Sequence, residues 1–204
     1  MTNLTIDIFK KMLDRALVDI KAREDEFSQL DAQTGDGDHG TAIVAALSAT
    51  TKVAANGTEF KGMLNDIGFG IMLETSGSTS TLLGAFFLGM SDVANGTELS
   101  AEDMKAMFSG GLTNVRKQTK AAVGDKTMMD ALIPAVEAIE GSTATDIKQI
   151  LAEGAKAAIA GADATVDMVA KFGRARNYGE RSKGFMDSGA ASWSCMFNSF
   201  AEAI

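Results

Sequence analysis

An acidic segment rich in glycine is the first stretch of this sequence that could do chemistry. Residues 31–40 read Asp-Ala-Gln-Thr-Gly-Asp-Gly-Asp-His-Gly and place three carboxylates, Asp31, Asp36 and Asp38, within eight positions. The intervening glycines permit the tight backbone of a loop, and a curled loop can direct all three carboxylates to one point. Because like charges held so closely need compensation and the segment has no Lys or Arg, a hard divalent cation such as Mg²⁺ is the natural partner.

A helix is expected to begin directly after these carboxylates, near His39–Thr41. Free amides at a helix N-terminus bind phosphate, so a metal and a helix start together would form a phosphate site. The glycine-rich loop of nucleotide-binding proteins, G-x-x-x-x-G-K-[ST], is absent,. An EF-hand is excluded because its twelfth position would be Ala42 instead of Glu,. An acidic turn that only caps a helix remains the alternative to a metal site.

His39 is the single histidine of the chain. It is either a hydrogen-bonded residue at the helix start, a contact to phosphate, a phosphohistidine or a general base. The sequence leaves these roles open.

Basic residues gather in a second polar segment, residues 173–192, of a chain whose formal net charge is −8. This segment contains Arg174, Arg176, Arg181 and Lys183. It is either a solvated basic loop, a clamp that neutralises phosphate, or a surface that docks an acidic partner. A third polar segment, residues 76–81, also separates two apolar patterns. Lys126 is interpreted as simply a loop lysine, in preference to a mobile contact over the site.

Helices must position these segments, because apolar residues recur at spacings of three and four along most of the chain. The expected helices are 6–20, 43–53, 60–73, 82–93, 104–115, 131–139, 147–159, 166–172 and 190–201. Capping boxes are expected at Ser100–Asp103 and Thr143–Asp146. Alternating strand patterns are absent. The sequence therefore predicts an all-α, single-domain fold of about eight antiparallel amphipathic helices.

The composition restricts the classes of partner. An acidic chain repels nucleic acid and anionic membranes at long range, so we expect neither as a partner. No apolar run approaches the roughly 20 residues that span a membrane. The start of the chain, residues 1–8, lacks the pattern of a signal peptide, and the single cysteine, Cys195, forms no internal disulfide,. We expect a cytoplasmic protein.

Three segments together resemble the L subunit of bacterial dihydroxyacetone kinases, which binds the nucleotide. They are Asp31–Thr41, then Gly124-Asp-Lys-Thr-Met-Met-Asp130, and then Gly173–Ala190 with the motifs G-R-A-x3-G-E-R-S and D-S-G-A. The segments stand in the family's order, and the resemblance covers essentially the whole chain, residues 1–204. It implies a barrel of eight helices with the nucleotide site at one end.

The resemblance also implies roles for individual residues. Asp31, Asp36 and Asp38 would bind two Mg²⁺ on the phosphates of ADP or ATP. Arg174 would contact the nucleotide and offset charge during phosphoryl transfer, and Met128 would form a wall of the adenine pocket. The other residues expected to line the nucleotide are His39, Gly40, Thr41, Ala42, Thr79, Ser80, Thr119, Asp187, Ser188 and Gly189.

Several positions depart from the family pattern. Ala42 stands where Asn is usual, Thr119 replaces Gly, and Ser188 replaces Pro. Residues 78–84 read S-T-S-T-L-L-G in place of A-S-G-P-L-Y-G. The metal ligands are intact. These departures leave open a related subunit that acts on another short ketose.

In the family, the substrate is held on a histidine of a separate K subunit, so we expect this chain to be inactive alone. The resemblance favours ADP as a resident cofactor that a phosphohistidine of an M-type subunit, supplied by phosphoenolpyruvate, rephosphorylates. An ATP-dependent kinase subunit and a nucleotide-loaded module that binds a transcription regulator remain alternatives.

Overall fold

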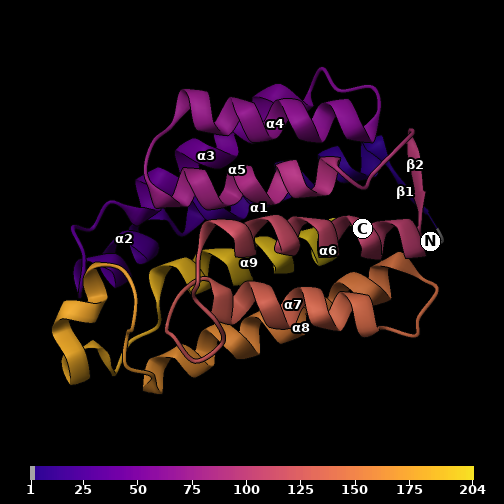
Figure 1. Cartoon of the computed structure of the whole chain (residues 1–204). Helices are drawn as coiled ribbons and strands as arrows, with labels where there is room; N and C mark the ends of the chain where they lie inside the picture. The colour runs from indigo at the N-terminus through magenta and orange to yellow at the C-terminus, as the bar shows by residue number, and fades with distance from the viewer. Residues whose placement is uncertain (1–2) are drawn as a thin grey trace.

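Helices form almost all of the regular structure in residues 3–204, the part of the chain that the computed structural model describes (Figure 1). Met1 and Thr2 lie outside the described residues. They are the first two residues of the segment 1–8, which lacks a signal-peptide pattern. The α-helices are α1 (Ile6–Ala22), α2 (Glu24–Ala32), α3 (His39–Ala54), α4 (Phe60–Glu74), α5 (Ser78–Ser91), α6 (Ala101–Gln118), α7 (Met129–Gly141), α8 (Ile147–Ala164) and α9 (Ser188–Glu202). The short elements are the strands β1 (Asn3–Thr5) and β2 (Glu98–Ser100) and the 3-10 helices η1 (Thr165–Asp167) and η2 (Arg174–Ser182).

Eight of the described α-helices, all except α2, form a closed ring. Each contacts the next along the chain, and α9 returns to contact α1. Neighbouring helices run antiparallel, so α3, α5, α7 and α9 all begin at the same end of the ring (Figure 1). The antiparallel β1–β2 pair, with Asn3 opposite Ser100, lies at the other end. The expectation of an all-α barrel of about eight antiparallel helices is confirmed.

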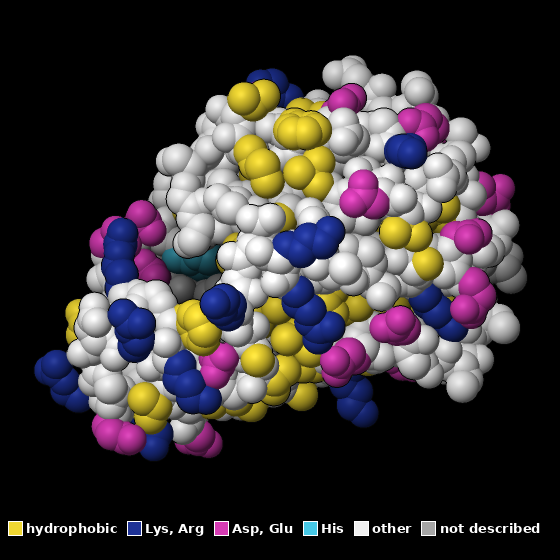
Figure 2. Space-filling model, viewed as in Figure 1, with side chains coloured by type: hydrophobic (Ala, Val, Ile, Leu, Met, Phe, Trp, Pro, Cys, Tyr) yellow, Lys and Arg dark blue, Asp and Glu magenta, His cyan; other side chains and the backbone are white. Residues whose placement is uncertain are grey.

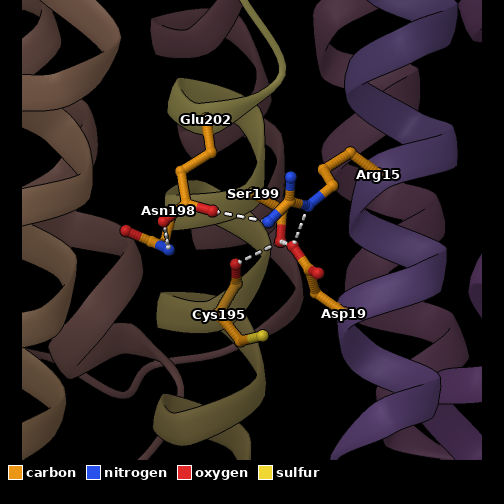
Figure 3. Close-up of polar contacts among 6 residues, drawn as sticks. All are labelled: Arg15, Asp19, Cys195, Asn198, Ser199 and Glu202. Carbon is orange, nitrogen blue, oxygen red and sulfur yellow. Dashed lines mark hydrogen bonds and ion pairs between the residues drawn. The ribbon is translucent and has the colours of Figure 1, made fainter.

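A polar seam joins α1 to α9 and closes the ring (Figure 3). Arg15 on α1 donates to Asp19 at 2.6 Å and to Glu202 of α9 at 2.7 Å. Ser199 of α9 donates to Asp19 at 2.8 Å. Exposed ion pairs of this kind contribute little energy individually, so the seam mainly sets how the first and last helices align.

The interior of the ring is filled by apolar side chains at the positions that the helical periodicity marked. Phe86 of α5 packs edge-on against Trp193 of α9, with ring centroids 5.2 Å apart, and also meets Phe108 of α6. Phe197 and Phe200 extend this aromatic cluster. No helix within residues 3–204 combines the length and the apolar character needed to cross a membrane.

Local signals were only partly correct at the helix ends. Ser100 and Asp103 form the expected capping box of α6, but α8 is capped by Asp146 alone and not by Thr143. The expected helix 166–172 is wrong. Its amides have partners elsewhere: the amide of Ala170 donates to Ser182 Oγ at 2.9 Å, which a helix would not allow,. Helix α2 and the two short strands were not expected.

Candidate functional site

A cavity of about 470 Å³ lies at the end of the ring where four helices begin. The first residues of α3, α5, α7 and α9 all line it, namely His39, Ser78, Met129 and Ser188. Helix N-termini carry partial positive charge and free amides, so the antiparallel ring directs four of them at one cavity. Figure 2 shows the histidine side chain inside a hollow, with acidic and basic side chains nearby.

The three predicted carboxylates meet at this cavity. Asp31 lies in the last turn of α2, Asp36 follows in the loop, and Asp38 directly precedes α3. One oxygen from each lies within 4.8 Å of the others. The amide of Gly37, which has a φ of 78°, donates to Asp31 Oδ2 at 2.8 Å and so holds the loop against α2. The convergence agrees with the sequence prediction, although Asp31 belongs to a helix and not to the loop.

Arg174, at the start of η2, reaches across to the acidic cluster and forms an ion pair with Asp36. The guanidinium lowers the pKa of Asp36, and the carboxylate in turn raises the pKa of Arg174. Both side chains are exposed, so water screens the pair and it adds little stability. The ion pair is informative about the geometry of the site, because it shows that a positively charged side chain of this protein can reach the carboxylates.

His39 connects the starts of three helices. Its Nε2 lies 2.8 Å from Ser192 Oγ on α9, and its Nδ1 lies 3.3 Å from Thr79 Oγ1 on α5. Ser192 Oγ donates to the carbonyl of Gly189, so it accepts from Nε2–H and leaves Nδ1 to accept from Thr79,. Burial lowers the pKa of His39, although Asp31 and Asp38 oppose this effect. This geometry fits a neutral, hydrogen-bonded residue at the helix start.

Lys126 lies in the loop before α7, as expected, but its side chain is buried and bonded, unlike that of an ordinary loop lysine. Only 2% of the residue is exposed, and its Nζ donates to the carbonyls of Thr165 at 2.5 Å and Phe185 at 2.6 Å. Burial lowers the pKa of Lys126, while Asp187, Asp130 and Asp167 oppose that effect. Its φ of 57° costs roughly 1–2 kcal/mol for a residue with a side chain,. Lys126 also lines the cavity.

Most residues expected at a nucleotide site line the cavity, including each of the three metal-ligand candidates. The cavity-lining members of the expected set are Asp31, Asp36, Asp38, His39, Ala42, Thr79, Thr119, Met128, Arg174, Asp187, Ser188 and Gly189.

Gly40, Thr41 and Ser80 lie outside the lining. Gly40 is buried against α2, where an added Cβ would lie 2.0 Å from the carbonyl oxygen of Glu24. The hydroxyl of Thr41 donates to the side chain of Glu24 at 3.1 Å. The buried hydroxyl of Ser80 accepts from Thr75 at 2.7 Å. The side chains of Thr41 and Ser80 therefore support the helix starts, and Gly40 allows α3 to approach α2 closely.

Sequence reasoning missed the apolar wall of the cavity, formed in part by Leu82, Phe172, Phe185, Met186 and Trp193. Four of these, Phe172, Phe185, Met186 and Trp193, stand in or beside the polar segment 173–192. The signal that could have identified these residues is the presence of apolar side chains within an otherwise polar loop. Such side chains indicate that the loop covers another apolar surface.

Comparison with known protein families shows that residues 33–202 of this chain match the family model of the DAK2 domain. The phosphoenolpyruvate-dependent dihydroxyacetone kinase 2 ADP-binding subunit DhaL of Listeria innocua is 32% identical over 184 residues, which cover 87% of this chain and 85% of that protein. The corresponding Escherichia coli K12 subunit is 33% identical over 191 residues, 91% of each chain. The D-erythrulose kinase of Mycolicibacterium smegmatis is 33% identical over 190 residues, which cover 89% of this chain but 32% of that protein.

Among solved structures, the dihydroxyacetone kinase of C. freundii in complex with AMP-PNP and Mg²⁺ superposes with a TM-score of 0.73. The match covers 100% of this chain and 35% of that one, at 23% identity. This chain thus spans about a third of that kinase. At such identity the likeness shows a shared fold and nothing finer.

Proposed function

Because this chain belongs to the DAK2 domain family, we propose that it is the ADP-binding subunit of a dihydroxyacetone kinase supplied by phosphoenolpyruvate. The observation that carries the proposal is the meeting of three carboxylates, Asp31, Asp36 and Asp38, with four helix N-termini at one cavity. A cluster of carboxylates alone would repel phosphate. Carboxylates that share a divalent cation, beside helix amides that donate to oxygen, form a site for a magnesium nucleotide.

The donor set fits magnesium. Carboxylate oxygens are the ligands that Mg²⁺ prefers, and the ion keeps water and phosphate oxygens in its remaining positions. Asp31, Asp36 and Asp38 would hold two such ions, which would neutralise the nucleotide phosphates. The ion pair of Asp36 with Arg174 supports this fit only in that the cluster draws a positive charge to itself.

The remaining lining residues would hold the nucleotide. The starts of α3 and α5, around His39–Ala42 and Thr79–Ser80, would donate amides to phosphate oxygens. Thr119, Met128 and the turn Asp187–Gly189 would contact the nucleoside. Asp187 is suited to fix this turn, because its carboxylate accepts from the amide of Ala190 at 2.8 Å and caps α9. We treat residues 1–204 as one domain built around this site.

Arg174 is the residue to which we assign a catalytic role. Phosphoryl transfer needs mainly positioning and compensation of charge on the transferred group. The guanidinium is exposed, lies on a short 3-10 helix and already pairs with a carboxylate of the cluster. It can exchange that carboxylate for a phosphoryl oxygen at little cost in energy, because the exposed ion pair is weak.

Partner subunits complete the proposed reaction. A K-type subunit would hold the ketose, and an M-type subunit would return a phosphoryl group from its phosphohistidine to resident ADP. Dihydroxyacetone is the proposed substrate because the L. innocua and E. coli relatives are subunits of kinases for it. The similarity to a D-erythrulose kinase favours another short ketose as the alternative, in an ATP-dependent kinase.

The purified chain tests this proposal directly. We expect ADP to co-purify at close to one per chain, to survive dialysis in Mg²⁺, and to be released by a chelator of divalent cations. Denaturing the protein and identifying the released nucleotide by chromatography would measure this. Asp38→Asn should lose the nucleotide while its helical circular dichroism stays unchanged. An empty wild-type chain that turns over steadily with added ATP and the K subunit would contradict the resident cofactor.

A further inference from the structure

Lys126 is a buried charged residue to which the proposed chemistry gives no role. It lies in the loop before α7, two residues ahead of Met128, and it lines the cavity. A residue with φ of 57° and an ammonium withdrawn from water is unfavourable by itself,. Its surroundings must therefore hold it in place.

The ammonium of Lys126 joins three segments that are distant in the sequence. It donates to the carbonyl of Thr165, at the end of α8, and to the carbonyl of Phe185, in the segment before α9. It also lies 5.0 Å from the centroid of the Phe185 ring. One side chain therefore ties the loop before α7 to the segment before α9, with the end of α8 as the common support.

The segment before α9 is attached to the same support by its backbone. The amide of Gly184 donates to the carbonyl of Val166 at 2.9 Å, and the amide of Asp187 donates to Thr165 Oγ1 at 2.9 Å. A Cβ added at Gly189 would lie 3.1 Å from Met128 Cβ. The two cavity walls, Met128 and the turn Asp187–Gly189, therefore meet directly beside the Lys126 contacts.

The charges around Lys126 explain why its ammonium stays in this position. Asp130 lies at the start of α7, where its two oxygens accept the amides of Gly124 at 2.6 Å and Thr127 at 2.8 Å. Asp187 is buried, which raises its pKa to about 7, and the nearby ammonium of Lys126 opposes that rise. The two carbonyls in direct contact, and the carboxylates at longer range, together compensate the buried cation.

We propose that Lys126 is a positioning residue whose buried ammonium holds Met128 and the turn Asp187–Gly189 together as one wall for the nucleoside. The role rests on the proposed nucleotide site, but it concerns the nucleoside half of that site and not the metal. Lys126 acts through the carbonyl of Phe185 and touches no reacting atom.

Hydrogen exchange of the ligand-free protein tests the positioning without any nucleotide. Lys126→Met keeps the apolar stem and removes the ammonium. We expect the amides of Gly184, Asp187 and Ala190 to exchange at least tenfold faster in this variant, because the support of their segment is lost. Lys183→Met is the matched control, since Lys183 is exposed and pairs only locally with Glu180; its exchange should equal that of the wild type.

Binding measurements separate positioning from a general loss of structure. In Lys126→Met, the affinity for ADP with Mg²⁺ should fall at least tenfold, whereas the affinity for tripolyphosphate with Mg²⁺ should change less than twofold. Lys126→Gly removes the same ammonium but relieves the positive φ, so it serves where the methionine variant folds poorly. It should show the same divergence between the two ligands.

Two results would overturn the proposal. One is unchanged exchange of residues 184–190 in both variants, and the other is an equal loss of ADP and tripolyphosphate affinity. A wild-type chain that binds no ADP in Mg²⁺ would contradict the proposed function instead, and the exchange comparison would still decide the role of Lys126.

Discussion

The close approach of α3 to α2 at Gly40 makes Gly40→Ala a sensitive test of how the acidic cluster is built. Gly40 is the second residue of α3 and faces α2. An added Cβ would lie 2.0 Å from the carbonyl oxygen of Glu24 and 2.4 Å from Ser28 Oγ. Real Cβ atoms stay at least 3.0 Å from such atoms, so α2 must move by about 1 Å or more.

The expected loss of stability follows from two opposing terms. Overpacking costs about 1–3 kcal/mol, and the upper value applies because the nearest atom is backbone and not a flexible side chain. Replacing glycine by alanine in a helix raises the free energy of unfolding by up to about 1 kcal/mol, which offsets part of that cost. The difference is about 2 kcal/mol, which lowers the Tm of a chain of this size by about 4–8 °C.

The same displacement should weaken ligand binding. Asp31 lies on α2, whereas Asp38 directly precedes α3, so separating the helices moves the carboxylates apart. Metal ligands tolerate deviations of only about 0.2 Å, and a shift near 1 Å exceeds this. We expect the affinity for ADP with Mg²⁺ to fall at least tenfold.

Gly141→Ala provides the matched control. Gly141 ends α7, and a Cβ there would meet nothing within 4 Å. The identical chemical change should therefore stabilise the protein slightly and leave ADP affinity unchanged. Differential scanning calorimetry and titration calorimetry measure both quantities. If Gly40→Ala matched Gly141→Ala in both, the argument that this contact sets the geometry of the acidic cluster would be wrong.

Two further predictions concern Arg174 and His39. In an assay reconstituted with the partner subunits, Arg174→Ala should lower turnover at least tenfold, or about 1.4 kcal/mol, with a smaller effect on ADP retention. Arg176→Ala, at an exposed neighbour, is the control. Equal turnover of Arg174→Ala and the wild type would show that Arg174 is only a solvated surface residue. Burial lowers the pKa of His39 in the folded protein below its ordinary value of 6.5, so the unfolded chain binds a proton first as pH falls,. The stability that neutral His39 contributes is therefore full above pH 6.5 and declines below it, down to the lowered pKa. Thermal denaturation between pH 7.5 and 5.5 should show this decline in the wild type and a smaller one in His39→Gln; parallel curves would refute it.

The sequence alone determined the eight ring helices and the acidic cluster, because both depend on short-range patterns. Spacings of three and four place apolar residues on one face of a helix whatever its neighbours are. Asp31, Asp36 and Asp38 lie within eight residues, so any compact local backbone brings them close. Eight of the nine expected helices belong to the ring, since each amphipathic stretch needs one buried face.

Only the tertiary structure decided which residues meet across the cavity. The periodicity in 166–172 predicted a helix, but contacts from the segment 182–184 replaced the helical hydrogen bonds. Lys126 resembled any loop lysine until its ammonium was found between Thr165 and Phe185. Its partners are 39 and 59 residues away in the sequence. Closing the ring brings such residues together, and no spacing along the chain encodes that, because the contact depends on how whole helices pack.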